Sequence, residues 1–450
     1  MNMHNDALRP TGHAVAQSGG DLSMNTMMRS AVSVVAPASL GFPRGAARTS
    51  IGDDAAVRLE VRNVYKIFSA NPKPALSMLR QGASKAEVLE KLNVNVGVLD
   101  ASFQVRTGEI FVIMGLSGSG KSTMIRLLNR LIEPSSGEIL LDGKDLVSMS
   151  KAELIQARRR NMGMVFQSFA LMPHLSALDN AAFGLEISGA SKAERHKAAQ
   201  QALEQVGLGT YAHRYPREMS GGMQQRVGLA RALANDPTIL LMDEAFSALD
   251  PLIRTEMQDE LLRLQREQQR TIVFISHDLD EAMRIGDRIA IMEGGRIVQV
   301  GTPYEILSRP ADDYVRSFFR NVDASKVLRA GDVARYEATN TVIRLPGELA
   351  PALQQLRENH HNFGYVRTQD GRFEGVVSQT TLERELNGPQ PRFINAFLPD
   401  VRTVNAATPI HALLALVADT EWPVPVVDDD GNFLGAISRA LMLHTLVRGD

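Results

Sequence analysis

The most distinctive chemical pattern in the sequence is a glycine-rich loop that ends in a lysine and a serine. Residues 115–122 are Gly-Leu-Ser-Gly-Ser-Gly-Lys-Ser, which fits the spacing G-x-x-x-x-G-K-[ST]. The glycines let backbone N–H groups point at a β-phosphate, and the lysine reaches the β- and γ-phosphates. The final hydroxyl can bind Mg²⁺. The alternative is a glycine turn with a chance lysine, but the strand and helix expected on either side are the context that the motif requires. The predicted phosphate-binding residues are Gly115, Leu116, Ser117, Gly118, Ser119, Gly120, Lys121, Ser122 and Thr123.

A second pattern places two carboxylates at the end of an apolar strand. Ile239-Leu-Leu-Met is followed by Asp243 and Glu244. Asp243 suits the coordination sphere of Mg²⁺, normally through water, and Glu244 can polarise an attacking water as general base. Carboxylates at strand ends are often only helix N-caps, so the pair alone leaves both interpretations open. Beside the phosphate loop (residues 115–122), the catalytic interpretation is favoured.

The elements around these motifs have the pattern of an α/β domain. From Val57 to about Phe319, short apolar segments alternate with amphipathic ones, which predicts a largely parallel sheet with helices. Glu109–Met114 is expected to be a buried strand that leads into the phosphate loop, and Lys121–Leu131 the helix that follows it. Thr238–Met242 and Thr271–Ser276 are expected to be further strands.

The region after residue 322 contains an internal repeat. Residues 365–378 align with residues 425–438 at one constant offset. Asp-Gly between apolar runs is a hairpin signal, so each copy predicts strand, tight turn, strand and helix. The identical pairs are Asp370/Asp430, Gly371/Gly431, Phe373/Phe433, Gly375/Gly435 and Ser378/Ser438.

Composition excludes several classes of protein. The chain of 450 residues has a net charge of -2 and 0 Cys, so no nucleic-acid partner is expected and no disulfide or thiolate metal site is possible. Arg158-Arg159-Arg160 could be a basic patch, but without interleaved aromatics a solvated helix face is favoured. No apolar run approaches the ~20 residues that span a bilayer. Residues 1–54, rich in Ala, Ser, Gly and Met, are expected to be a disordered extension, or to precede a later start such as Met24 or Met27.

Further motifs, in their order along the chain, resemble those of ABC-type ATPases. Ser220-Gly-Gly-Met-Gln224 resembles the ABC signature, with Met219 and Met223 in place of the commoner Leu and Gln. By this resemblance Gln167 is the glutamine that senses Mg²⁺ and the membrane partner, and Ser247–Asp250 is the D-loop. His277 is then the switch histidine that contacts the γ-phosphate. Phe68, with Tyr65 as the less favoured choice, is the aromatic that stacks on adenine.

The resemblance implies an α/β P-loop ABC ATPase domain at 55–321, with a mixed sheet and a helical subdomain at about 168–230. A tandem CBS-type α+β regulatory module would follow at 322–450. It implies ATP and Mg²⁺ as ligands and a head-to-tail homodimer in which each nucleotide lies between two copies. The implied catalytic residues are Glu244, His277, Lys121 and Gln167, and the implied metal site comprises Ser122, Gln167 and Asp243. The implied nucleotide contacts outside the loop are Phe68, Ser220, Gly221, Gly222 and Asp250.

Within that family the chain is most similar to ATP-binding subunits of bacterial glycine betaine/L-proline importers, which take up quaternary amines. The insertion Ala70–Val96, the run Gln167–His174 and the run Met242–Arg254 carry this likeness. It implies a peripheral protein at the cytoplasmic face of the bacterial inner membrane, bound to an integral membrane permease and served indirectly by a substrate-binding protein. The first repeat departs from the usual CBS pattern in its N-terminal half. The alternatives are import of choline or carnitine, or a soluble ABC ATPase of repair or translation.

Overall fold

The computed structural model describes residues 32–34, 55–320, 325, 328–334, 341–345 and 347–447. It divides into two compact units. One unit holds residues 341–403 and the strand at 32–34, and the other holds the described residues from 55 to 334 and from 404 onward. The extension predicted at 1–54 lies outside the described residues, apart from β1 (Val32–Val34), which pairs in parallel with Val401–Thr403.

A six-stranded sheet forms the centre of the larger unit, in the order β11-β10-β4-β9-β8-β7. Its neighbours pair in parallel except β10 and β11, which are antiparallel. Every residue of β4 and β9 is buried, as expected for continuous apolar runs covered on both faces. The strands are β4 (Ile110–Met114), β7 (Met162–Val165), β8 (Ile239–Asp243), β9 (Thr271–Ser276), β10 (Arg288–Glu293) and β11 (Arg296–Gly301).

A second, antiparallel sheet has the order β3-β2-β5-β6 and packs on one face of the first. A hydrophobic core lies on each face of the six-stranded sheet. Alternate residues of β4 belong to one core or the other, because successive side chains of a strand point to opposite faces. Phe111 and Ile113 pack toward the antiparallel sheet, with Phe111 stacked on Phe103 at a ring distance of 5.2 Å. Ile110 and Val112 belong to the core on the other face. The strands are β2 (Val57–Phe68), β3 (Asn95–Arg106), β5 (Ser136–Leu141) and β6 (Lys144–Asp145).

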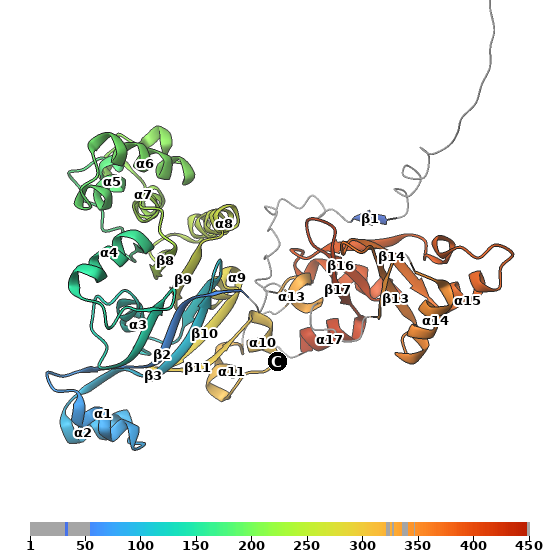
Figure 1. The fold of residues 1–450 in the computed structure, drawn as a ribbon, viewed down its shortest axis with the longest axis horizontal. Coiled ribbons are helices and arrows are strands. Elements are labelled where there is room, and N and C mark those ends of the chain that lie inside the picture. The colour runs from blue at the N-terminus through green and yellow to red at the C-terminus, as the bar shows by residue number, and fades with distance from the viewer. Residues whose placement is uncertain are drawn as a thin grey trace, which may run out of the picture. The chain divides into compact units, whose positions relative to one another are not determined.

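Two groups of helices in the larger unit pack among themselves: the pair α1 and α2, and the group α5 to α7. The insertion between β2 and β3 forms α1 (Lys73–Arg80) and α2 (Lys85–Leu92), which build a small core with Tyr65 and Ile67. Helices α5 to α7 pack on one another, where the helical subdomain was expected (Figure 1). The remaining bounds are α3 (Lys121–Leu128), α4 (Lys151–Asn161), α5 (Ala177–Ile187), α6 (Lys192–Gln205), η2 (Gly209–Tyr211), η3 (Pro216–Glu218), α7 (Gly221–Leu233), α8 (Pro251–Gln268), α9 (Leu279–Ile285), α10 (Pro303–Ser308) and α11 (Asp313–Phe318).

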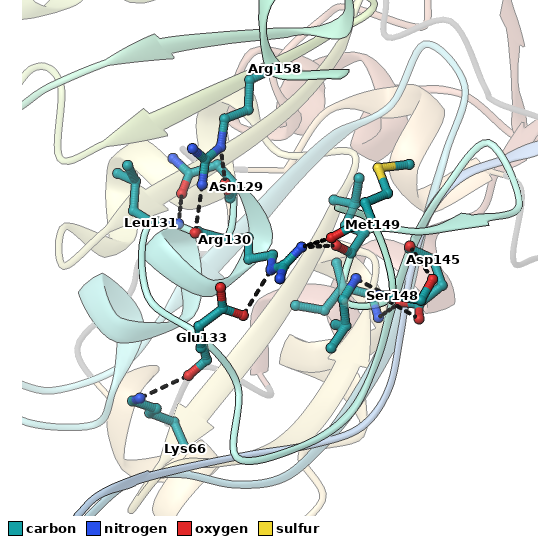
Figure 2. A network of polar contacts seen from close by, with 12 residues as sticks. Lys66, Asn129, Arg130, Leu131, Glu133, Asp145, Ser148, Met149 and Arg158 are labelled. Carbon is teal, nitrogen blue, oxygen red and sulfur yellow. Dashed lines mark hydrogen bonds and ion pairs between the residues drawn. The ribbon is translucent and has the colours of Figure 1, made fainter. Parts of the chain in front are cut away.

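The helix after the phosphate loop ends at Leu128, three residues before the predicted end at Leu131. Arg130 adopts a left-handed φ of 52°, and its guanidinium donates to the carbonyls of Leu146 and Met149 at 2.8 and 2.7 Å. Arg158 of α4 donates to the carbonyls of Asn129 and Arg130 at 2.7 and 2.6 Å (Figure 2). Cations at a helix C-terminus satisfy its last carbonyls and its dipole. The first arginine of the run 158–160 therefore has a structural task, whereas Arg160 is exposed as predicted for a solvated face.

The two repeats have the same strand arrangement. The first comprises β12 (Thr341–Arg344), α14 (Leu349–Glu358), β13 (Phe363–Arg367), β14 (Phe373–Ser378), α15 (Gln379–Leu386) and η4 (Phe393–Ala396). The second comprises β15 (Val401–Asn405), η5 (Ile410–Leu413), α16 (Leu414–Asp419), β16 (Val424–Val427), β17 (Phe433–Ile437) and α17 (Arg439–Val447), and α13 (Ala330–Ala334) packs against it. In each, a strand pairs in parallel with the first arm of a hairpin.

The two hairpins share one register, which confirms the predicted strand, turn and strand in both copies. Val366 pairs with Gly375 and Val426 pairs with Gly435, and in both hairpins the register shifts at the next residue. The Asp-Gly turns close in the same way, through Gly371 N to Thr368 O and Gly431 N to Asp428 O, both at 3.1 Å. Among the described residues, no helix is both long enough and apolar enough to cross a bilayer.

Candidate active site

The phosphate loop leaves the end of the buried strand β4 and enters α3 at Lys121. Gly120 caps the helix with a left-handed φ of 106°, and a Cβ there would lie 2.6 Å from the carbonyl oxygen of Gly97. A Cβ on Gly115 would lie 2.1 Å from the carbonyl oxygen of Met292. At these two positions only glycine fits, because a side chain would overlap fixed backbone atoms.

Inside the loop, the structure buries a positive charge. Lys121 is buried, and its Nζ donates to the carbonyls of Gly115 and Leu116 at 2.8 and 3.1 Å. Burial lowers the pKa of Lys121, while the nearby carboxylates of Glu244 and Asp243 oppose the shift. The Ser119 hydroxyl is also buried and has no hydrogen-bond partner within the described residues. A buried ammonium and an unpaired buried hydroxyl are costly unless an anion accepts their hydrogen bonds, and a phosphate oxygen would do so.

Two of the three residues expected to hold Mg²⁺, Ser122 and Asp243, lie near each other beside this loop. The Ser122 hydroxyl, at the start of α3, lies near the carboxylate of Asp243 at the end of β8 and acts to lower the pKa of that carboxyl. Burial and the negative charge of Glu244 raise the pKa of Asp243, against the opposing effects of Arg126, Lys121 and Ser122. A hydroxyl and a carboxylate are oxygen ligands of the kind that Mg²⁺ prefers, and a cation would stabilise this partly buried carboxylate as an anion. The donor set therefore fits the metal.

Two predicted catalytic side chains converge on the carboxylate of a third, Glu244. Gln167 Nε2 donates to Glu244 Oε2 at 3.3 Å, and His277 Nδ1 lies 3.1 Å from the same oxygen. These residues follow β7, β8 and β9, which are adjacent parallel strands, so their carboxyl ends share one edge of the sheet. Glu244 has a left-handed φ of 47°, a conformation that costs energy and that concentrates at functional sites. We call Gln167, Asp243, Glu244, His277 and the phosphate loop the strand-end site.

The exposed aromatic at the end of β2 is Phe68, whose residue is 50% exposed. Its ring touches the backbone next to the phosphate loop: a Cβ on Gly97 would lie 2.7 Å from a Phe68 ring carbon and 3.2 Å from the Thr123 methyl. Lys66 Nζ lies 5.3 Å from the ring centroid. Tyr65 is only 8% exposed and belongs to the core of the α1–α2 insertion. Of the two predicted candidates, only Phe68 can offer a ring face to a base.

The remaining predicted nucleotide contacts form a second group, at the starts of two helices. Ser220 caps α7, and its Oγ accepts from Met223 N at 3.3 Å. Asp250 caps α8, and its Oδ1 accepts from Ile253 N at 3.1 Å. Gly222 lies against α8, since a Cβ there would be 2.5 Å from the Ile253 side chain. Because these caps use ordinary N-terminal geometry, a contact with nucleotide stays a prediction for Ser220, Gly221, Gly222 and Asp250.

Sequence reasoning placed Ser247 in the D-loop without predicting its contacts beside the strand-end site, and it gave Asp278 no role. Ser247 Oγ accepts from Gln167 Nε2 at 3.3 Å and donates to the Glu244 carbonyl at 2.9 Å. Asp278 caps α9 through Glu281 N at 3.1 Å and accepts from Arg254 at 2.9 Å. The Asp-x-x-Glu spacing after His277 is an N-cap signature that could have been found. Nothing in the local sequence pairs Arg254 with Asp278.

Comparisons with known proteins follow the same division of the chain. The family model described as ABC transporter matches residues 98–247, and the CBS domain model matches residues 396–448. The chain is 56% identical over 395 residues to the glycine betaine/proline betaine transport system ATP-binding protein of Salmonella typhimurium, covering 87% of this chain and 98% of that protein. The protein of the same description from Escherichia coli K12 is 56% identical over 396 residues, with coverage of 87% and 98%. The glycine betaine/carnitine transport ATP-binding protein of Listeria monocytogenes is 48% identical over 390 residues, with coverage of 86% and 97%.

Proposed function

The chain belongs to the family of ABC transporter ATP-binding subunits, which are ATPases coupled to transport, and from that premise we propose its cargo and its catalytic residues. We propose that it powers uptake of a compatible solute, with glycine betaine, proline betaine and L-proline as the first candidates. The observation that carries the catalytic part is the convergence of Gln167, Glu244 and His277 within hydrogen-bonding distance beside the phosphate loop. Support for the cargo comes from the named relatives, which match over almost their whole length.

The proposed roles follow from chemistry and position. Backbone N–H groups of the phosphate loop and Lys121 would bind the β- and γ-phosphates, and Phe68 would stack on adenine. Ser122, Asp243 and Gln167 would hold Mg²⁺, which when bound supplies positive charge to the phosphate oxygens. Glu244 is the proposed general base, because its carboxylate lies where the polar side chains meet. His277, 3.1 Å from that carboxylate, is the proposed contact of the γ-phosphate and helps to orient the base.

A second copy of the chain is the proposed partner at the nucleotide. Two helix N-termini repel across an interface unless an anion lies between them, so α7 of one copy and α3 of the other would be joined by ATP. Ser220, Gly221, Gly222 and Asp250 would then contact the nucleotide held by the other copy. Hydrolysis would weaken this contact and let the two copies separate. The dimer would therefore form with ATP bound and come apart after hydrolysis.

The proposed location is the cytoplasmic face of a bacterial inner membrane, where the chain would bind an integral permease served by a substrate-binding protein. This proposal rests on the transport-system relatives. The repeats are proposed to form a paired regulatory module over 322–450. Their shared hairpin register and the CBS match at residues 396–448 support this part.

The test is solute uptake by the reconstituted complex of this chain, its permease and its binding protein in proteoliposomes loaded with Mg-ATP. Labelled glycine betaine should accumulate, and excess unlabelled proline betaine should compete more strongly than carnitine or choline. The matched control is the same complex with Glu244→Gln, which should bind ATP and transport nothing. Stronger competition by choline or carnitine would correct the cargo. Absence of ATP-dependent uptake of glycine betaine, proline betaine, L-proline, choline and carnitine alike, each tested in labelled form, would contradict the proposal.

A further inference from the structure

The segment that carries His277 is anchored by a buried polar cluster on its sheet side. Ser276, at the end of β9, is 1% exposed, Gln258 of α8 is 4% exposed and Glu281 of α9 is 5% exposed. The Ser276 hydroxyl donates to Glu281 Oε2 at 2.5 Å, and Gln258 Nε2 donates to Glu281 Oε1 at 3.2 Å. A buried carboxyl group with partners on both oxygens holds those partners in place, because breaking either bond would leave a buried polar atom without a hydrogen bond, which costs free energy.

Asp278, directly after the histidine, is held from two directions. Its N–H donates to Ser276 Oγ at 2.9 Å, and its Oδ1 accepts from Glu281 N at 3.1 Å as the cap of α9. Its other oxygen, Oδ2, accepts from Arg254 Nη1 at 2.9 Å. One carboxylate therefore joins the histidine segment to α9 and, through Arg254, to α8.

Arg254 also holds the loop that precedes its own helix. Its second terminal nitrogen, Nη2, donates to the Leu249 carbonyl at 3.3 Å. The other end of this loop is tied to the strand-end site, since Ser247 bonds the Glu244 carbonyl and Gln167. The loop 247–250 thus has one end on the proposed base and the other end on the guanidinium that grips Asp278.

We propose that Arg254 is a positioning residue that couples the loop 247–250 to the segment carrying His277, so that displacement of the loop shifts the histidine relative to Glu244. The inference deepens the proposed function and rests on it, because the loop includes Asp250, a proposed contact across the dimer. When a second copy binds, it would displace the loop 247–250 of the first copy. Through Arg254, this displacement would change the position of His277 in that same first copy. The planar guanidinium suits this task because its two terminal nitrogens reach two acceptors in fixed geometry, which a lysine ammonium on a flexible stem does not provide.

The test compares Arg254→Ala, Arg254→Lys and Asp278→Asn in the full-length chain, with ATP hydrolysis, ATP binding and thermal stability measured together. Each variant should lower kcat by about tenfold, the worth of a hydrogen bond to a charged group, with KM for ATP nearly unchanged. Asp278→Asn tests the same link without removing the cap, since asparagine also caps helices. Combining Arg254→Ala with Asp278→Asn should cost little more than either change alone, because both remove one link.

Asp259→Ala is the matched control. Asp259 accepts from Arg284 at 2.7 Å and so joins the same two helices, α8 and α9, away from the histidine segment. It should lower the melting temperature without changing kcat, which separates positioning from a purely structural role. Wild-type kcat in Arg254→Ala and Asp278→Asn, or additive losses in the double variant, would overturn the inference. Lack of hydrolysis by the unaltered protein would instead contradict the proposed function.

Discussion

The strand-end site and the two hairpin repeats both carry recurring sequence patterns, but the patterned residues occupy different kinds of position. In the strand-end site they stand at the carboxyl ends of β4, β7, β8 and β9, where polar side chains from separate segments meet. In the repeats they lie in and around tight turns, where the glycine N–H of each Asp-Gly pair donates a backbone bond across the turn at 3.1 Å. The first pattern gathers the proposed catalytic side chains, and the second sets the points where the chain reverses direction.

The glycines show this difference most directly. A side chain at Gly115 would overlap a backbone oxygen at 2.1 Å, so the phosphate loop needs glycine for close approach. Gly431 has a left-handed φ of 82° and open space where a Cβ would stand, so its turn needs glycine for conformation alone. Substitutions in the two regions should therefore change different measured quantities, activity in one and stability in the other.

The largest expected effect is on the proposed general base. Glu244→Gln keeps the shape of the side chain and removes its basicity, so hydrolysis should fall by about 10²–10⁴ with ATP binding retained. Steady-state turnover and equilibrium nucleotide binding measure the two quantities. Asp313→Asn, which changes an exposed carboxylate of α11, is the control and should hydrolyse ATP normally. Unchanged turnover in Glu244→Gln would contradict the proposal that Glu244 is the general base.

The next effect concerns recognition of the base at Phe68. Phe68→Ala should weaken ATP binding by about 1–3 kcal/mol, the usual worth of stacking a base on an aromatic ring. Tyr65→Phe keeps a buried ring and serves as the control, with unchanged affinity expected. Titration with ATP and with inorganic triphosphate sharpens the result, because only ATP offers an adenine. Equal losses for both ligands would place Phe68 among residues that only support the fold.

In the repeats, the turn glycines should affect stability and leave catalysis unaltered. Gly371→Ala and Gly431→Ala force alanine into left-handed backbone with φ of 96° and 82°, which costs roughly 1–2 kcal/mol. Denaturant unfolding of the full chain should show the loss, and ATP hydrolysis should match the wild type. Gly82→Ala is the matched control: it puts the same left-handed backbone strain in the turn after α1, outside the repeats, so its loss of stability can be compared with that of the repeat variants. A change in kcat in either repeat variant would mean that the turns bear on chemistry.

The smallest expected change in basal hydrolysis comes from removing residues 322–450. The residues that would act on ATP within one copy all lie between Phe68 and His277, so basal turnover should persist. We expect the dependence of transport on ionic strength to change, because the repeats are the proposed regulatory module. Uptake by proteoliposomes over a series of salt concentrations measures it. An identical salt profile with and without the repeats would contradict a regulatory role.

Local patterns were enough for the elements that local chemistry controls. The phosphate loop between strand and helix and both Asp-Gly hairpins were predicted correctly, because glycine spacing and strand periodicity act over a few neighbouring residues. The end of α3 was predicted three residues too late, because Arg130 and Arg158 stop it with contacts that come from other segments. Similarity in sequence indicated Gln167 and His277 as site residues but carried no geometry for them.

Other features of the molecule depend on the tertiary structure and could not be read from the sequence. The sequence by itself determined the phosphate loop, the acidic strand end and the duplicated hairpins, whose signals are contiguous along the chain. The folded chain decided that Phe68 is exposed while Tyr65 is buried, that Gln167 and His277 meet at Glu244, and that Arg254 grips Asp278. These depend on which strands and helices become neighbours, a property of long-range packing that the spacing of nearby residues does not encode.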